Sequence, residues 1–128
     1  MDLMDYFEKT QGLGVLSTAD SEGKVNSAVY SRPHFMKDST VAFIMPDRLT
    51  HHNLTTNPHA AYLFRENGPG YKGKRLYLTK VREEADTALI ESLRRKVYPP
   101  EFEEKAGPKS VVFFKIEKEL PLVGSEEV

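Results

Sequence analysis

The segment DRLTHHNLTTNPHA, residues 47–60, holds three histidines beside an arginine and several threonines. His51 and His52 together suggest a metal site, but a zinc site needs three or four ligands that converge on one point. Adjacent residues of a helix point about 100° apart, so these two histidines cannot easily share an ion. His59 follows Pro58 in the next element. We therefore predict no metal site, and we expect packed or solvated histidines.

The residues before the histidines suit an anion better. The apolar run 41–45 predicts a buried strand, and a short helix is expected over 48–57. A helix N-terminus offers unpaired backbone N–H groups and a favourable dipole to an anion. Arg48 adds a forked cation and Thr50 a hydroxyl donor, both suited to phosphate oxygens. The alternative stays open that Asp47 or Thr50 only caps the helix and that Arg48 is solvated.

The composition of the chain narrows the class of protein. It has 128 residues, 39% hydrophobic and 29% charged, with a formal net charge of −1, which predicts one globular domain over 1–128 and no basic excess for nucleic acid or anionic membrane. The absence of cysteine excludes disulfides, thiolate-held iron–sulfur clusters and covalent c-type haem. The acidic, amphipathic first residues and the lack of a long apolar run predict a cytoplasmic protein without a membrane partner.

Two further groups of residues could do chemistry. The segment RENGPGYKGKRLY, residues 65–77, interleaves basic and aromatic residues, as surfaces that bind single-stranded nucleic acid do. The near-zero net charge favours a glycine-rich hairpin with a solvated basic flank, so we predict no nucleic-acid partner. Ser17, Ser27 and Ser31 lack the G-x-S-x-G elbow of a nucleophilic serine.

The remaining patterns predict the elements that must position these residues. Strands are expected at 13–18, 24–36 (interrupted at Pro33), 41–45, 59–65, 74–83 and 110–119, and helices at 2–11, 48–57 and 86–97. About six strands in a meander-like succession with few helices predict a small, nearly closed antiparallel barrel with its helices outside.

The chain resembles the pyridoxamine 5'-phosphate oxidase-like family, the FMN-binding split barrels, in its small FMN-binding protein type. The matching order covers nearly the whole chain: GVLSTADSEGKVNSA (14–28), YSRPHF (30–35), VAFIMPDRLTHHNLTTNP (41–58) and AAYLF (60–64), then a strand-helix-strand close. Its most specific parts are the G-x-L-S-T-x-D-x-x-G-x-x-N opening and the N-L-x-x-N-P segment.

The resemblance implies a mostly-β, six-stranded antiparallel split barrel with a Greek key, and a homodimer that binds two FMN molecules at the subunit interface. The resemblance also implies which residues bind the cofactor. Along the isoalloxazine ring they are Val29, Tyr30, Ser31 and Arg32, and at the ring or the ribityl chain they are Ile44 and Met45. At the phosphate they are Arg48, Leu49 and Thr50, and Asn53 follows one helical turn later. The family often places a lysine beside its phosphate-site arginine, where this chain has Leu49 and Thr50. One phosphate cation is therefore missing, and FMN affinity is weakened or the partner subunit supplies the charge.

The function implied by this resemblance is that of an FMN-dependent oxidoreductase of unknown substrate, served by a redox partner or a nicotinamide donor. No catalytic acid or base is identified, and His34 is the titratable neighbour of the ring strand. Oxidation of pyridoxamine phosphate is not expected, because the tryptophan and arginine segment that completes that substrate site has no counterpart. Two alternatives stay open: a flavin store or electron carrier without turnover, and a relative that binds deazaflavin or haem.

Overall fold

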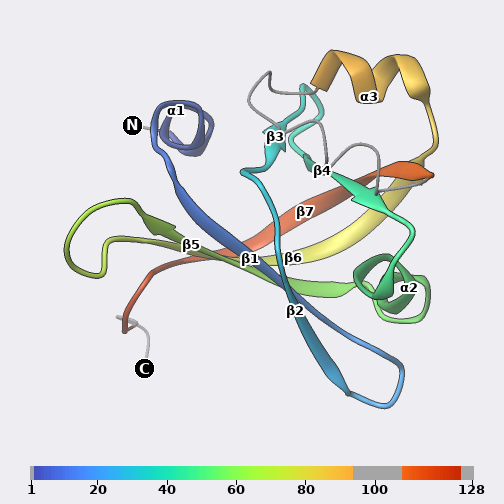
Figure 1. The fold of residues 1–128 in the computed structure, drawn as a ribbon, viewed down its shortest axis with the longest axis horizontal. Helices are drawn as coiled ribbons and strands as arrows, with labels where there is room; N and C mark the ends of the chain where they lie inside the picture. Colours follow the sequence, from blue (N-terminus) through green and yellow to red (C-terminus); the bar gives the residue numbers. More distant parts are fainter. Residues whose placement is uncertain (1, 94–107, 125–128) are drawn as a thin grey trace.

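The computed structural model describes residues 2–93 and 108–124 (Figure 1). Its elements in chain order are α1 (Leu3–Lys9), β1 (Gly12–Ala19), β2 (Val25–Val29), β3 (His34–Phe35), β4 (Val41–Pro46), α2 (Leu49–Thr56), β5 (His59–Glu66), β6 (Gly73–Glu84), α3 (Thr87–Leu93) and β7 (Lys109–Pro121). Each predicted helix and strand is confirmed to within a few residues, with two exceptions: the run 24–36 forms two strands, and the end of the helix expected over 86–97 lies outside the described residues.

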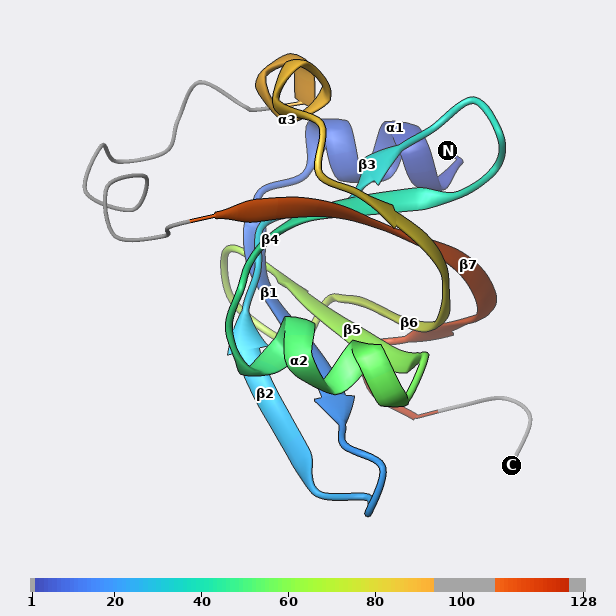
Figure 2. The ribbon, with the colours of Figure 1, turned by 90° about the vertical axis from the view of Figure 1, so that its right-hand side faces the viewer.

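The seven strands of the described residues form one antiparallel sheet in the order β2-β1-β5-β6-β7-β4-β3, which curls into a barrel (Figure 2). The predicted mostly-β antiparallel fold is confirmed, with one strand more than expected. The extra strand arises because the run 24–36 leaves the ladder after Val29 and pairs again only at β3. The break spans residues 30–33 and so includes Pro33, where the sequence predicted an interruption.

The core lies inside the barrel and is rich in aromatic rings. Alternate residues of β1, β4, β5 and β6 point inward, as a strand period of two requires. The helix α1 contributes Phe7, which is fully buried with its ring 5.1 Å from Phe64 and 6.2 Å from Tyr62. Asp2 caps this helix by accepting a hydrogen bond from the backbone N–H of Asp5. The helix therefore packs its apolar face on the barrel.

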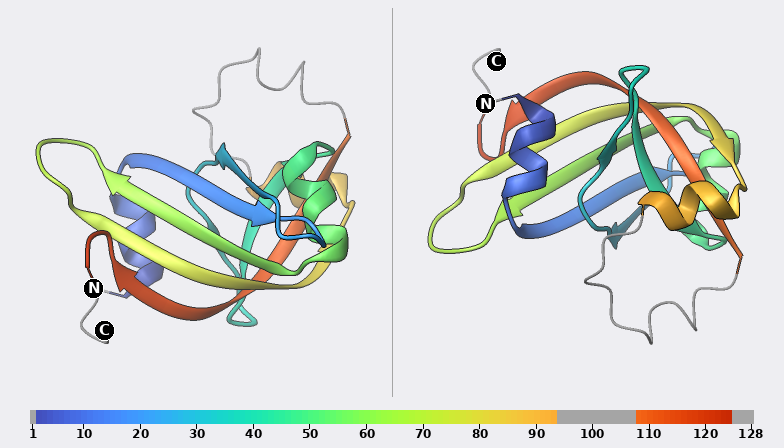
Figure 3. Two further views of the ribbon diagram at one scale, coloured as in Figure 1. Left: turned by 90° about the horizontal axis from the view of Figure 1, so that it is seen from below. Right: turned by 90° about the horizontal axis from the view of Figure 1, so that it is seen from above.

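A smaller apolar cluster lies on the outside of β4 and β7. Ala42, Val111 and Phe113 pack there against Leu89, Ile90 and Leu93 of α3. Figure 3 shows α1 and α3 on one side of the barrel and α2 on the other. In the described part of the chain, no helix has the length and apolar character that a membrane span requires.

Candidate functional site

The start of α2 follows the end of the buried strand β4, as the sequence predicted. Val41, Phe43 and Met45 of β4 lie in the core, and a tight turn after Pro46 brings the N–H of Arg48 to 2.9 Å from the Pro46 carbonyl oxygen. Arg48 has extended backbone angles and occupies the N-cap position. Its side chain has only donors, so it cannot accept a bond from the first-turn N–H groups of the helix. The first turn of α2 therefore has no side-chain cap from Arg48.

Thr50 is the centre of a polar cluster at this end of α2. It is only 3% exposed, and its Oγ1 accepts a hydrogen bond of 3.2 Å from the side-chain amide of Asn26 on β2. The hydroxyl of Tyr30 hydrogen-bonds with Thr50 and lies in the field of Arg48. Burial raises the pKa of Tyr30, and Thr50 and Arg48 offset that rise only in part. Tyr30 is therefore a neutral hydrogen-bond donor at physiological pH.

Asn53 holds α2 against the barrel. It is 2% exposed, and its amide donates a hydrogen bond of 3.1 Å to the hydroxyl of Thr18 on β1. Leu54 is buried in the core beside it. Asn57 ends the helix as C-cap, and its side-chain oxygen accepts from the N–H of His59. The N-L-x-x-N-P motif thus attaches the middle of α2 through Asn53 and ends the helix at Asn57, which gives Asn53 a structural contact.

The predicted site residues fall into two groups. Tyr30, Arg48 and Thr50 come together at the start of α2. Ile44 and Met45 do not share a surface, because successive residues of a strand point to opposite faces: Met45 is fully buried in the core and Ile44 faces the other side of β4.

Val29 and Leu49 are the exposed apolar members of the predicted set, at 71% and 55% of their surface. Ser31 is exposed, and its carbonyl accepts a hydrogen bond of 3.1 Å from the hydroxyl of Tyr62. The same hydroxyl lies 3.3 Å from the Tyr30 carbonyl. Tyr62 therefore fixes the backbone between β2 and β3, a role that sequence reasoning missed.

Arg32 contacts the end of α1. One guanidinium nitrogen donates to the carbonyl oxygens of Phe7 at 2.8 Å and Thr10 at 3.0 Å, with that of Glu8 at 3.4 Å. A cation at a helix C-terminus satisfies carbonyls that lack an intrahelical partner and is favoured by the helix dipole. The structure thus gives Arg32 a contact that the sequence did not predict.

We expect Arg32→Ala to lower the free energy of unfolding by about 1 to 2 kcal/mol, because several carbonyls lose a charged donor. Urea unfolding measures this change. Arg32→Lys should recover part of it, because it restores the charge. Unchanged stability, together with a shifted reduction potential of a bound flavin, would instead assign the guanidinium to the ring.

Asn26 is the residue of the cluster that the sequence did not single out. It stands in the G-x-L-S-T-x-D-x-x-G-x-x-N opening, where strand alternation places it on the inward face with Thr18, its register partner. That alternation was the available signal. The contact itself joins Asn26 to Thr50, 24 residues later, which no local pattern reports.

The histidines of the segment 47–60 lie apart. His51 contacts Asp47 and Glu83, whereas His59 is exposed on β5. Among the residues that the structure describes, no group of three histidine, cysteine, aspartate or glutamate side chains could hold a metal ion.

The basic hairpin between β5 and β6 uses its cations within the chain. Lys74 pairs with Glu119 at 2.7 Å, and Arg75 donates to the carbonyl oxygen of Pro121 at 2.9 Å. Arg65 donates to carbonyls of the glycine-rich loop, at 2.9 Å in the case of Gly70. Lys74, Arg75 and Arg65 of the segment 65–77 therefore have partners within the chain, whereas Lys72 is exposed.

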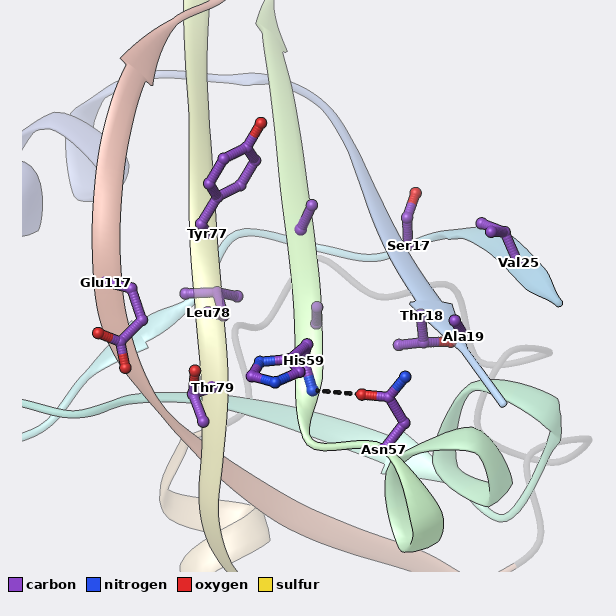
Figure 4. Close-up of a pocket in the computed structure, with 12 residues that line it drawn as sticks. Ser17, Thr18, Ala19, Val25, Asn57, His59, Tyr77, Leu78, Thr79 and Glu117 are labelled. Carbon is purple, nitrogen blue, oxygen red and sulfur yellow. Dashed lines mark hydrogen bonds between the residues drawn. The ribbon is translucent and has the colours of Figure 1, made fainter. Parts of the chain in front are cut away.

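A groove of about 550 Å³ lies on the outer face of the sheet (Figure 4). Its walls come from β1, β2, β5, β6 and β7, with Ser17, Val25 and Tyr77 around it and His59 and Glu117 toward one end. Its lining does not include the cluster at the start of α2. The groove and the polar cluster are separate features of the surface.

No protein-family profile matches the chain, and no curated protein sequence matches it. Solved structures do. An FMN-binding protein from Syntrophomonas wolfei subsp. wolfei has 22% identity and a TM-score of 0.73, over 94% of this chain and 84% of that one. A putative pyridoxamine 5'-phosphate oxidase from Lactobacillus delbrueckii has 15% identity and a TM-score of 0.64, over 91% and 88%. An F420 reductase has 13% identity and a TM-score of 0.63, over 93% and 97%. The chain therefore has the antiparallel split-barrel fold of FMN-binding and pyridoxamine 5'-phosphate oxidase-like proteins.

Proposed function

We propose that this chain is an FMN-binding flavoprotein and that the start of α2 holds the phosphate of the flavin. The observation that carries the proposal is the convergence of Arg48, Thr50 and Tyr30 at a helix N-terminus. The split-barrel fold, shared with a protein described as FMN-binding, supports the choice of ligand.

The donors of this cluster fit a phosphate. A phosphate monoester has its second pKa near about 6 and is mostly a dianion at neutral pH. Arg48 offers a guanidinium fork, and the first-turn N–H groups of α2 offer backbone donors. The oxygen of Thr50 accepts a bond from Asn26, and Thr50 and Tyr30 share a further hydrogen bond. One hydroxyl proton of the Thr50–Tyr30 pair is therefore left to donate to a phosphate oxygen.

The ring would lie along residues 29–33, where the chain leaves the ladder between β2 and β3. Val29 and Leu49 expose apolar surface there. A bound flavin supplies hydride and electron transfer at its ring. The residues of this chain bind the phosphate and orient the ring, and Tyr62 holds the backbone of Tyr30 and Ser31 in place. Oxidoreductase activity, with a redox partner or nicotinamide donor, belongs to the proposal, as does the cytoplasmic location predicted from sequence.

The proposed ligand is tested by equilibrium titration with FMN, riboflavin, the deazaflavin F420 and haem. We expect FMN to bind at least about tenfold more tightly than riboflavin, because only FMN brings the phosphate. Equal affinities would contradict the phosphate site. Preference for the deazaflavin would favour the second candidate, which the fold shared with an F420 reductase supports. A flavin that no nicotinamide cofactor reduces would favour a carrier without turnover.

The proposal includes a homodimer with the flavins at its interface. The outward positions of β1 and β2 carry apolar or small side chains and no charge: Leu13, Val15, Ser17, Ala19, Val25, Ser27 and Val29. The register places Val15 between Val29 and Leu63 on the same face. In a sheet with one face in solvent, the side chains on that face are normally polar. The uncharged outer face of β1 and β2 is therefore suited to burial against a second copy of the chain.

We expect Leu63→Glu to convert the dimer to a monomer, because it places an unpaired charge in the apolar band. Light scattering coupled to gel filtration measures the mass in solution. Val123→Glu is the matched control, since Val123 is also an exposed apolar residue but lies after β7. A wild-type chain that is monomeric at every concentration would contradict the homodimer.

A further inference from the structure

His51 joins two carboxylates from different parts of the chain. Its Nδ1 lies 3.2 Å from Asp47 Oδ1, one helical turn earlier, and its Nε2 lies 2.9 Å from Glu83 Oε2 near the end of β6. The side chain of His51 is only 15% exposed. The other oxygen of Glu83 accepts from the ammonium of Lys80 at 2.6 Å. The contacts connect Asp47, in the turn before α2, and His51, in α2, with Glu83, which is 32 residues after His51.

The fold brings β6 under both ends of α2. The pairing of β6 with β7 shifts register between Lys80 and Arg82, and such irregularities re-aim the side chains that follow. Glu83 comes directly after this shift and meets His51 at the start of α2. The backbone N–H of Lys80 donates to the carbonyl of Pro58, just past the end of α2. His51 therefore supplies the attachment at the end that carries Arg48.

The two contacts require two N–H donors on one imidazole. Only the imidazolium donates at both nitrogens, whereas the neutral ring has one donor and one acceptor. A neutral ring would turn a lone pair toward one of the two carboxylates and lose that bond. The two contacts are therefore satisfied together only by the protonated ring.

The surroundings of His51 favour the charged form. Burial acts to lower the pKa of His51, but the hydrogen bonds to Glu83 and Asp47 and their charges outweigh it and raise the pKa above the ordinary 6.5. The positive charge of Lys80, on the far side of Glu83, acts against the charged form of His51. Near His51 on α2 itself, Arg48 is cationic and His52 is titratable. The polar residues that β1 and β2 present to α2, Thr18 and Asn26, are uncharged. The pKa of Glu83 is lowered, with Lys80 and His51 outweighing its burial.

We infer that His51 is a clasp on the proposed phosphate site, which holds the Asp47 carboxylate and the start of α2 when protonated and releases them when neutral. The inference rests on the proposed function and adds its regulation. Asp47 immediately precedes Arg48, so loss of the imidazolium charge of His51 leaves the Asp47 carboxylate uncompensated beside the cation that meets the phosphate. Phosphate affinity therefore falls as the pH rises through the raised pKa of His51.

The first test is the dissociation constant of FMN as a function of pH in the wild type, His51→Gln and His52→Gln. His52 is the exposed neighbour of His51 and provides the control. In the wild type and in His52→Gln, the constant should rise about threefold or more between about pH 6.5 and about pH 8.5. His51→Gln should lack this rise. Because all three proteins bind the same ligand, titration of the phosphate itself cancels in the comparison. Equal pH profiles in the wild type and His51→Gln would overturn the inference.

The second test needs no flavin. The folded pKa of His51 is raised above 6.5, so its contribution to stability is complete below pH 6.5 and is lost as the pH rises through the folded value. The gap in melting temperature between the wild type and His51→Gln should therefore be largest below pH 6.5 and close as the pH rises through the raised pKa of His51. A gap that is the same at every pH overturns the clasp, whatever FMN does. A gap that closes while FMN fails to bind supports the clasp and contradicts the proposed function alone.

Discussion

Replacement of Arg48 by alanine should weaken FMN binding about ten- to a hundredfold. A hydrogen bond to a charged group contributes about 1.5 to 3 kcal/mol, and each 1.4 kcal/mol is about a tenfold change in the dissociation constant. Arg48 is the cation of the cluster at the start of α2, and by the resemblance Leu49 and Thr50 fill the region where a second cation would lie. No second cation of the cluster would compensate for its loss. Fluorescence titration of FMN measures the effect.

The phosphate origin of that loss can be separated from a general effect on the fold. Riboflavin affinity should be the same in the wild type and in Arg48→Ala, because riboflavin has no phosphate. Lys72→Ala removes an exposed cation from the β5–β6 hairpin and should leave FMN affinity unchanged. If Arg48→Ala binds FMN as the wild type does, the phosphate is held elsewhere.

Gly14→Ala should lower the free energy of unfolding by about 3 kcal/mol or more, the upper range for overpacking in a closed core. A Cβ at this position would overlap the Tyr62 hydroxyl and lie 2.6 Å from the carbonyl oxygen of Tyr30. Tyr62 would have to move, and its hydrogen bonds to Tyr30 and Ser31 would be lost with it. Chemical denaturation followed by circular dichroism measures the change.

The same substitution should also weaken flavin binding in whatever fraction stays folded, because the backbone between β2 and β3 is the segment along the proposed ring. Ser17→Ala is the control, since Ser17 is on the same strand but points outward and hydrogen-bonds Ser27 at 2.8 Å. Ser17→Ala should lower the free energy of unfolding by about 1 kcal/mol or less. A Gly14→Ala protein as stable as the wild type would mean that β1 and β5 can separate without loss, against the packing described.

The start of α2 could be predicted from sequence because its determinants are local. An apolar run that ends at Pro46, and an Asn-Pro step at 57–58, mark the limits of strand and helix within a few residues of where they lie. The strand-rich fold was predicted in the same way, from runs and turns that each occupy fewer than about a dozen residues.

The features that escaped prediction depend on contacts between distant segments. The ladder breaks after Val29, where Tyr62, some thirty residues later, binds the carbonyls of Tyr30 and Ser31. Arg32 was assigned to the ring by resemblance, yet it contacts the carbonyls of α1, more than twenty residues earlier. Sequence periodicity indicates on which face of a strand or helix a side chain lies, but not which distant residue it contacts.

The measurement that tests the central claim most directly is the visible absorption spectrum of the purified protein, before and after addition of FMN and removal of the excess by gel filtration. The account predicts a protein that is yellow, or that becomes yellow and retains one FMN per chain, and that loses this retention in Arg48→Ala. A colourless protein that retains no FMN at any stage would contradict it.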